Sequence, residues 1–126
     1  MKERFFACRH CGKMIAVIAE GGTPTVCCQE EMTELISNTV EASKEKHLPV
    51  VTVEGNRVRV NVGSAPHPMA PEHHIGWILL RTTHGSQRHD LTAGDKPTAD
   101  FLLSDGEKAE AVYAYCNLHG LWLTEI

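Results

Sequence analysis

The sequence predicts a mainly β protein in which a small four-cysteine metal knuckle precedes a β-sandwich of about seven short strands. Two observations lead to this prediction. Cys8, Cys11 and the pair Cys27-Cys28 are crowded near the N-terminus. After them, β-branched and aromatic runs alternate with polar residues, and turn residues separate the runs. We therefore expect two domains, residues 1–36 and residues 37–126.

A Cys-x-x-Cys pair followed by glycine begins the first predicted domain. Gly12 after Cys8 and Cys11 lets the chain curl so that backbone N–H groups face the sulfurs. Cys27 and Cys28 can approach the same ion if their turn is tight. Four thiolates suit a tetrahedral zinc or single-iron site, and so short a segment has too small a core to fold without such a staple. The spacing leaves zinc and iron open.

The overall composition excludes several classes of protein. The net charge of −4 argues against non-specific nucleic-acid binding. No apolar run approaches the ~20 residues of a membrane span, and no signal-peptide core precedes the first cysteine. We expect a cytoplasmic protein with neither a membrane nor a nucleic-acid partner. In that reducing compartment we expect the five cysteines to be metal ligands or redox groups rather than the disulfides of a secreted module.

The segment between the two predicted domains is polar. Met32, Leu35 and Ile36 lie at helical spacing within residues 29–40, so we expect one helical turn and then a crossover. A charged run follows, which we expect to be a loop. His47 ends this run and meets an apolar stretch, which predicts that it lies at the edge of a strand.

The strands of the sandwich are predicted from alternation and turn signals. We expect them at residues 50–53, 57–62, 75–81, 87–91, 99–103, 108–115 and 120–124. Trp77, Phe101 and Trp122 are expected in the core, whereas His84 and His89 lie near hairpin ends and are expected to be exposed.

Two further histidines lie before the third of these strands. Pro66 and Pro68 bracket His67, and each proline restricts its own φ and the residue before it, so the imidazole is held on a stiff loop. His73 immediately precedes a strand. His74 would point to the opposite side once that strand begins, so we choose His73 as the ligand.

A thiol and an imidazole lie three residues apart near the C-terminus. Cys116 and His119 would point to opposite faces of a strand, but Asn117 and Gly120 favour a turn that can bring both side chains to one point. A single cysteine is more often a small buried hydrophobe. The complete candidate set for one metal is His47, His67, His73, Cys116 and His119. Such a set suits an electron-rich metal and leaves one octahedral position open.

Together these motifs resemble desulfoferrodoxin, the two-iron superoxide reductase family. The resemblance covers essentially the whole chain. It rests on the four N-terminal cysteines, on Glu45-Lys46-His47-x-Pro49-Val50, on Pro66-His67-Pro68-Met69 with His73, and on Cys116-Asn117-x-His119-Gly120. His74, where the family often has an aromatic residue, and Pro71, where charged residues are common, are departures that remove no ligand.

The resemblance implies an immunoglobulin-like β-sandwich, a homodimer and two irons per chain. The first iron belongs to a desulforedoxin-like, rubredoxin-type electron-transfer centre with ligands Cys8, Cys11, Cys27 and Cys28. The catalytic iron has four ligands in a plane, His47, His67, His73 and His119, and the axial ligand Cys116. The open position is expected to face solvent.

The implied reaction is the one-electron reduction of superoxide to hydrogen peroxide, with rubredoxin as the expected electron donor, in the antioxidant defence of an anaerobe or microaerophile. Glu45 is expected to become the sixth ligand in the ferric state. Lys46 is expected near the open position, where it attracts the superoxide anion to a negatively charged protein. The alternatives are a non-catalytic iron electron carrier or a sensor of oxygen species. A zinc-ribbon binding module would leave the histidines unexplained.

Overall fold

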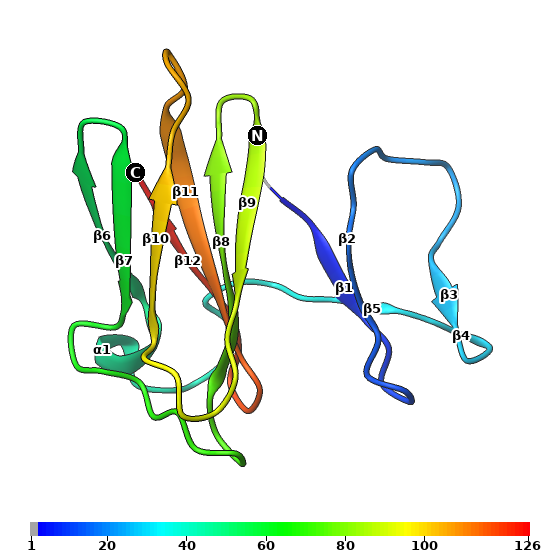
Figure 1. Cartoon of the computed structure of the whole chain (residues 1–126). Helices are drawn as coiled ribbons and strands as arrows, with labels where there is room; N and C mark the ends of the chain where they lie inside the picture. Colours follow the sequence, from blue (N-terminus) through cyan, green and yellow to red (C-terminus); the bar gives the residue numbers. More distant parts are fainter. Residues whose placement is uncertain (1–2) are drawn as a thin grey trace. The chain divides into compact units, whose positions relative to one another are not determined.

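The computed structural model describes residues 3–126, and the chain divides into two compact units, the first ending at Ile36 and the second spanning Ser37–Ile126 (Figure 1). In the first unit, antiparallel strands form a small sheet in the order β2-β1-β5. These strands are β1 (Phe5–Ala7), β2 (Met14–Ala16) and β5 (Thr33–Glu34). A separate two-stranded hairpin consists of β3 (Val26–Cys27) and β4 (Glu30–Glu31).

The expected helical turn within residues 29–40 is wrong, because β4 and β5 occupy this segment. Thr33 and Glu34 pair with β1, and the N–H of Leu35 donates to the carbonyl of Phe5 at 2.9 Å. Met32 is buried, but Ile36 is exposed. The residues at helical spacing therefore do not share one buried face, and pairing with β1 stabilises the extended conformation instead.

The only described helix, α1 (Lys44–His47), lies in the charged run where we expected a loop. It is a single turn. The N–H of Leu48 donates to the carbonyl of Lys44 at 2.9 Å, and Leu48 itself is extended before Pro49. Among residues 3–126, no helix is long and apolar enough to cross a bilayer.

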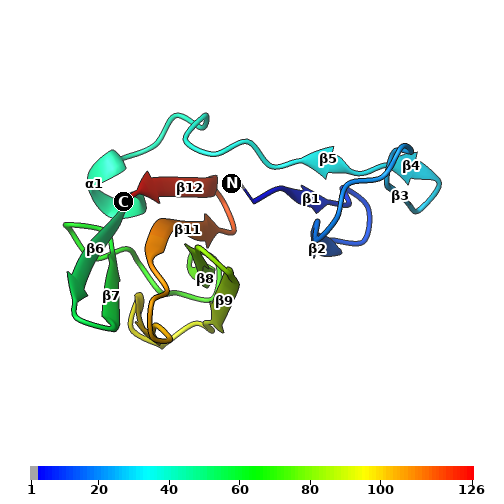
Figure 2. The same ribbon diagram turned by 90° about the horizontal axis from the view of Figure 1, so that it is seen from above.

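The second unit is a sandwich of two antiparallel sheets, as the sequence predicts (Figure 2). One sheet has the order β10-β7-β6 and the other β12-β11-β8-β9. The seven strands are β6 (Pro49–Glu54), β7 (Arg57–Val62), β8 (Ile75–Thr82), β9 (Gly85–Asp90), β10 (Thr98–Leu102), β11 (Ala109–Cys116) and β12 (Gly120–Glu125).

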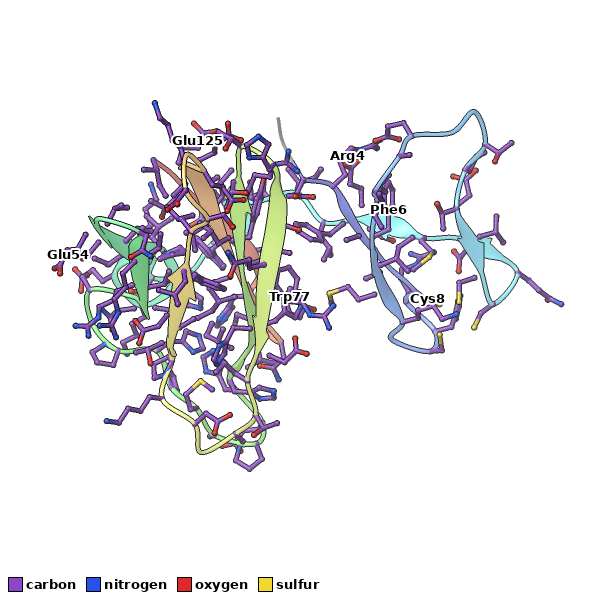
Figure 3. All side chains as sticks on the ribbon, turned by 45° about the horizontal axis from the view of Figure 1, so that its top comes forward. Arg4, Phe6, Cys8, Glu54, Trp77 and Glu125 are labelled. Atoms are coloured by element: carbon purple, nitrogen blue, oxygen red, sulfur yellow. The ribbon has the colours of Figure 1, made fainter. Side chains whose placement is uncertain are left out.

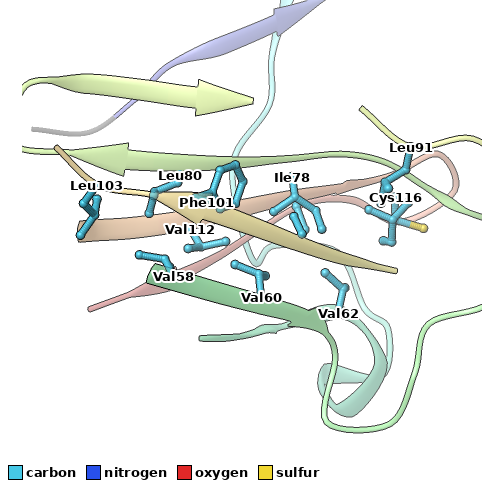
Figure 4. Packing of buried hydrophobic residues seen from close by; sticks show 13 residues of the cluster. Val58, Val60, Val62, Ile78, Leu80, Leu91, Phe101, Leu103, Val112 and Cys116 are labelled. Atoms are coloured by element: carbon cyan, nitrogen blue, oxygen red, sulfur yellow. The ribbon is translucent and has the colours of Figure 1, made fainter. Parts of the chain in front are cut away.

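The core lies between the two sheets (Figure 4). In β7 the valines Val58, Val60 and Val62 are buried and the residues between them are exposed, which is the pattern of a strand with one face on a core. They pack in one cluster with residues of β8, β10 and β11. Cys116 belongs to this cluster and is fully buried, so its thiol is held by the core itself.

The predictions for isolated aromatic residues and histidines have mixed outcomes. Phe101 and Trp122 are buried, and His84 and His89 are exposed, as expected. Trp77 is not in the core. It is only half-buried and stacks on Tyr115, with 5.7 Å between the ring centroids.

Candidate metal centres

The four N-terminal cysteines lie on two turns. Cys8 and Cys11 follow β1, whereas Cys27 ends β3 and Cys28 begins the turn into β4. In Figure 3, the labelled Cys8 lies near other sulfur atoms of the first unit. All four sulfurs lie within 4.8 Å of one another. The Cys11–Cys27 and Cys27–Cys28 sulfurs are 3.6 Å and 3.9 Å apart. A tetrahedron with metal–sulfur bonds of about 2.3 Å has edges of ~3.8 Å, so the arrangement fits one ion.

Backbone geometry shapes the first cysteine turn. Gly12 has φ 80°, and its N–H donates to the carbonyl of Cys8 at 3.1 Å. The N–H groups of Cys11 and His10 point at the Cys8 sulfur, at 3.5 Å and 3.4 Å. These donors lower the pKa of the Cys8 thiol to about 6, so its thiolate forms readily.

The nearby sulfurs shift the pKa values of Cys27 and Cys28 in the opposite direction. Side-chain interactions with the sulfurs of Cys11, Cys8 and Cys27 raise the pKa of Cys28 to about 12, and the sulfurs of Cys11 and Cys8 likewise raise the pKa of Cys27. Without a cation, thiolates this close oppose one another's ionisation. A bound metal ion removes that opposition, so the chemistry of this group also fits a metal site.

His10 lies between the first two cysteines but does not belong to the sulfur group. Its side chain is exposed, and its Nε2 contacts the carboxylate of Glu30 in β4. The guanidinium of Arg9 contacts the same carboxylate. Glu30 therefore links the first cysteine turn to the second.

The second group of candidate ligands comes from five separate places in the sandwich unit. His47 ends α1, His67 lies on the loop after β7, His73 precedes β8, Cys116 ends β11, and His119 lies on the turn into β12. The ligand atoms of His47, His67, His73 and Cys116 lie within 4.8 Å of one another. The Nδ1 of His119 is 3.0 Å from the Nε2 of His47 and 3.8 Å from the Cys116 sulfur.

The four imidazoles form a closed square. Going round it from His47 to His67, His73, His119 and back, adjacent ring centroids are 4.7, 4.6, 5.1 and 4.8 Å apart. Each ring is nearly perpendicular to the next, at 77°, 81°, 79° and 85°. Across the square, the rings of His47 and His73 are 6.3 Å apart. Such an arrangement can direct four nitrogens at one point without ring clashes.

Hydrogen bonds fix which nitrogens face the centre. The Nδ1–H of His47 donates to the carbonyl of Ser43, and that of His67 donates to the carbonyl of Pro68, both at 2.6 Å. Carbonyls only accept, so the Nε2 atoms of both neutral rings carry lone pairs, yet they are 3.2 Å apart. The buried Nε2 of His73 has no hydrogen-bond partner among the described residues. A cation between these nitrogens would bind the lone pairs that otherwise face one another without a donor. We conclude that the residues fit a metal.

Burial keeps these imidazoles neutral. Desolvation is the main cause that lowers the pKa of His67 to about 4, and it also lowers the pKa values of His47 and His73. The neighbouring histidines lower all three further. A neutral imidazole is the form that binds a metal, so the pocket is ready for one at neutral pH.

A glycine that sequence reasoning missed holds α1 in place. A Cβ on Gly63 would lie 2.5 Å from the carbonyl oxygen of Glu45. The same carbonyl accepts hydrogen bonds from the N–H of Ala65 at 3.0 Å and the hydroxyl of Ser64 at 3.2 Å. The loop that leads to His67 thus packs directly on the helix that carries His47. A glycine just after a predicted strand was the available signal.

The remaining predicted site residues lie close to this group. Glu45 and Lys46 are both exposed on α1. The Lys46 charge contributes to lowering the pKa values of His47 and His73, so it lies within electrostatic reach of the imidazoles. His74 is not in the group of possible ligands, whereas His73 is.

Asn117 has a larger role than that of a turn residue. Its side-chain oxygen accepts a hydrogen bond from the N–H of His74 at 2.9 Å, and its side-chain nitrogen donates to the carbonyl of Glu72 at 3.0 Å. The amide therefore ties the segment around His73 to the turn between Cys116 and His119.

Comparison with family models decides the family. The model described as the desulfoferrodoxin N-terminal domain matches residues 2–35, and the desulfoferrodoxin model matches residues 39–125. The chain belongs to the desulfoferrodoxin family. A desulfoferrodoxin of Syntrophotalea carbinolica is 43% identical over 124 residues, which cover 98% of this chain and 97% of the relative.

Two further relatives extend the comparison. The crystal structure of the superoxide reductase from Treponema pallidum is 37% identical, covers 99% of this chain and 100% of its own, and superposes with a TM-score of 0.83. A superoxide reductase of Pyrococcus horikoshii is 36% identical over 65% of this chain and 86% of its own length. The Pyrococcus horikoshii protein therefore resembles only part of this chain, whereas the Treponema pallidum protein resembles nearly all of it.

Proposed function

We propose that this chain is a superoxide reductase that carries two irons. The reaction combines superoxide with one electron and two protons to give hydrogen peroxide. The observation that carries the proposal is the square of four imidazoles beside the Cys116 thiol, in which the Nε2 atoms of His47 and His67 face each other at 3.2 Å and the buried Nε2 of His73 has no hydrogen-bond partner among the described residues. The relatives named superoxide reductase support the same reaction.

The chain's own residues define the catalytic centre. The Nε2 atoms of His47 and His67, the side chains of His73 and His119, and the thiolate of Cys116 would hold the metal. An iron held by these residues would supply the electron for superoxide. Burial lowers the pKa values of His47, His67 and His73 and so keeps these three imidazoles unprotonated for this role. The Cys116 thiolate would add negative charge that favours the oxidised iron.

The four-cysteine centre is proposed as the second iron site, with an electron-transfer role. Its ligands would be Cys8, Cys11, Cys27 and Cys28. Four thiolates whose sulfurs all lie within 4.8 Å of one another suit an iron that changes its charge without changing its ligands.

Lys46 and Glu45 are proposed to act at the open position of the catalytic iron. The net charge of −4 repels superoxide from the protein as a whole, so a local cation is needed to attract it. Lys46 is exposed and lies within electrostatic reach of two of the imidazoles. Glu45, its neighbour on α1, is proposed to bind the oxidised iron as a sixth ligand.

We also propose a rubredoxin-type electron donor, a homodimer and a cytoplasmic location. These rest on the family resemblance and on the reduced state that five free cysteines require. Sedimentation of the purified chain tests the dimer, and reduction by a rubredoxin tests the donor.

The experiment that tests the function measures iron per chain and then peroxide formed from superoxide under a reductant. Two irons and peroxide formed with turnover support the proposal. Two irons without peroxide would refute it and leave an electron carrier or sensor. One zinc and no oxidisable absorption band would favour a binding module.

A charge variant tests the role of Lys46. Lys46→Ala should slow the second-order reaction with superoxide about tenfold at low ionic strength, because local attraction raises encounter rates. The difference should shrink as salt is added, and the iron absorption spectrum should not change. Lys44→Ala, on the same helix, is the matched control. Equal rates for the two variants at low salt would show that Lys46 has no special role.

A further inference from the structure

Trp122 is the largest fully buried side chain of the protein among the described residues, with 1% of its surface exposed. It lies on β12 opposite Ala114 of β11. Its ring stacks on the imidazole of His47, with centroids 4.9 Å apart and planes 30° apart. Its Nε1–H donates to the backbone carbonyl of His119 at 3.1 Å. One side chain therefore contacts two of the four histidines in the square.

The two contacts constrain different motions. A hydrogen bond from Nδ1 to the carbonyl of Ser43 holds one edge of the His47 ring but lets the ring tilt about that bond. The flat face of Trp122 removes this tilt. The backbone of His119 lies on a turn beside Gly120, whose φ is 77°, and the indole N–H holds the carbonyl of that turn.

We propose that Trp122 is a positioning residue of the histidine centre. Its indole face sets the plane of the His47 ring, and its indole N–H sets the position of His119. The inference rests on the proposed metal centre, but it does not depend on the reaction with superoxide.

The indole also favours the metal-bound state over the empty one. A metal at Nε2 draws electron density from the His47 imidazole, which makes that ring more positive. The electron-rich face of an indole attracts positive charge. The stack between Trp122 and His47 should therefore strengthen when a metal binds.

The size of the effect follows from other metal sites. Loss of a group that orients a ligand typically weakens metal binding by about 10–100-fold. Trp122→Phe keeps an aromatic face but removes the N–H donor, so iron should leave the histidine centre up to about tenfold faster. Trp122→Leu removes both contacts, and the acceleration should approach about a hundredfold.

The test follows iron loss to a chelator from the full iron-loaded chain. One centre would have four thiolates and the other a single thiolate, so their visible iron bands should differ and the four-cysteine centre serves as an internal control. Trp77→Phe and Trp77→Leu are matched controls, because Trp77 is on the same sheet but stacks on Tyr115. We expect faster loss from the histidine centre in the Trp122 variants alone. Trp122→Phe should also change the electron paramagnetic resonance spectrum of that oxidised centre, whereas Trp77→Phe should not.

Three results would overturn the inference. The first is iron loss from both Trp122 variants at the wild-type rate. The second is equal acceleration in the Trp77 variants, which would indicate general destabilisation. The third is an unchanged resonance spectrum in Trp122→Phe, the variant that decides the matter if Trp122→Leu does not fold. A protein that keeps its iron but forms no peroxide would refute the proposed function and leave the role of Trp122 intact.

Discussion

The four-cysteine centre is assembled locally, whereas the histidine centre is assembled by the fold. Cys8 and Cys27 lie 19 residues apart, on two turns of one small unit. His47 and His119 lie 72 residues apart, and the turns and strand ends of a whole sandwich bring them together. A local site depends on its turns and its metal, while a dispersed site depends on every element between its ligands.

The two units also differ in the size of their apolar cores. Phe5, Cys8 and Met32 are the buried apolar residues among the described part of the first unit. The sandwich buries a contiguous cluster that includes Cys116 itself. The core of the first unit is too small to fold without a bound metal. The metal should therefore stabilise the first unit far more than it stabilises the sandwich.

The largest expected effects come from removing one thiolate from each centre. Cys11→Ser should abolish the bands of the four-cysteine centre and unfold the first unit, because metal binding and folding are coupled there. The histidine centre should keep its band. Cys116→Ser should abolish the band of the histidine centre and leave the bands of the four-cysteine centre in place. It should also remove most of the superoxide reduction. Visible and circular dichroism spectra of both variants check this. If either change abolished both centres, their independence would be disproved.

The next effect concerns the packing of α1 on its neighbouring loop. Gly63→Ala places a Cβ against backbone atoms of α1 that cannot move separately, so we expect a loss of about 1–3 kcal/mol in the free energy of unfolding. The histidine centre should also lose iron faster, and the four-cysteine centre should not. Gly76→Ala is the control, because the nearest atom to its Cβ would be at 3.9 Å. Equal unfolding curves for the two variants would contradict this account.

Acid should destabilise the sandwich unit because its buried histidines are neutral in the folded state. The buried pocket lowers the pKa of His67 to about 4, so between the ordinary value of 6.5 and 4 the unfolded chain binds a proton that the folded chain does not. The stability of the metal-free sandwich should therefore fall as the pH falls through this window. Denaturant titrations at several pH values measure the slope. His67→Gln should make it shallower, and an unchanged slope would show that His67 does not contribute.

The smallest effects concern two left-handed residues, one in each unit. Gln29 has φ 64°, so Gln29→Gly should stabilise the first unit by about 1 kcal/mol. Asn38 has φ 60°, but its side chain bonds both the N–H and the carbonyl of Leu123. Asn38→Gly should therefore destabilise the sandwich. Thermal unfolding of the two variants checks that one change raises stability and the other lowers it. A change in the same direction for both would contradict the account of either the backbone strain or the hydrogen bonds.

The sequence predicted the local features well. The spacing of Cys8, Cys11 and the Cys27-Cys28 pair is enough to predict one four-sulfur group, because turns of fixed length bring them together. The alternation in β7 predicted its buried face. The helix prediction failed in both directions, since a turn of helix formed in the charged run and strands formed where helical spacing was seen. Over so few residues, pairing with a neighbouring strand outweighs local periodicity.

The sequence by itself determined which residue types could bind metal, where the strands of the sandwich lie, and that two sites of different chemistry exist. Only the tertiary structure decided how the histidine centre is built. It placed four rings in a square, selected the nitrogens through the carbonyls of Ser43 and Pro68, and set Trp122 against His47. The physical reason is that these contacts join residues far apart in the chain, and their geometry exists only once the two sheets have packed.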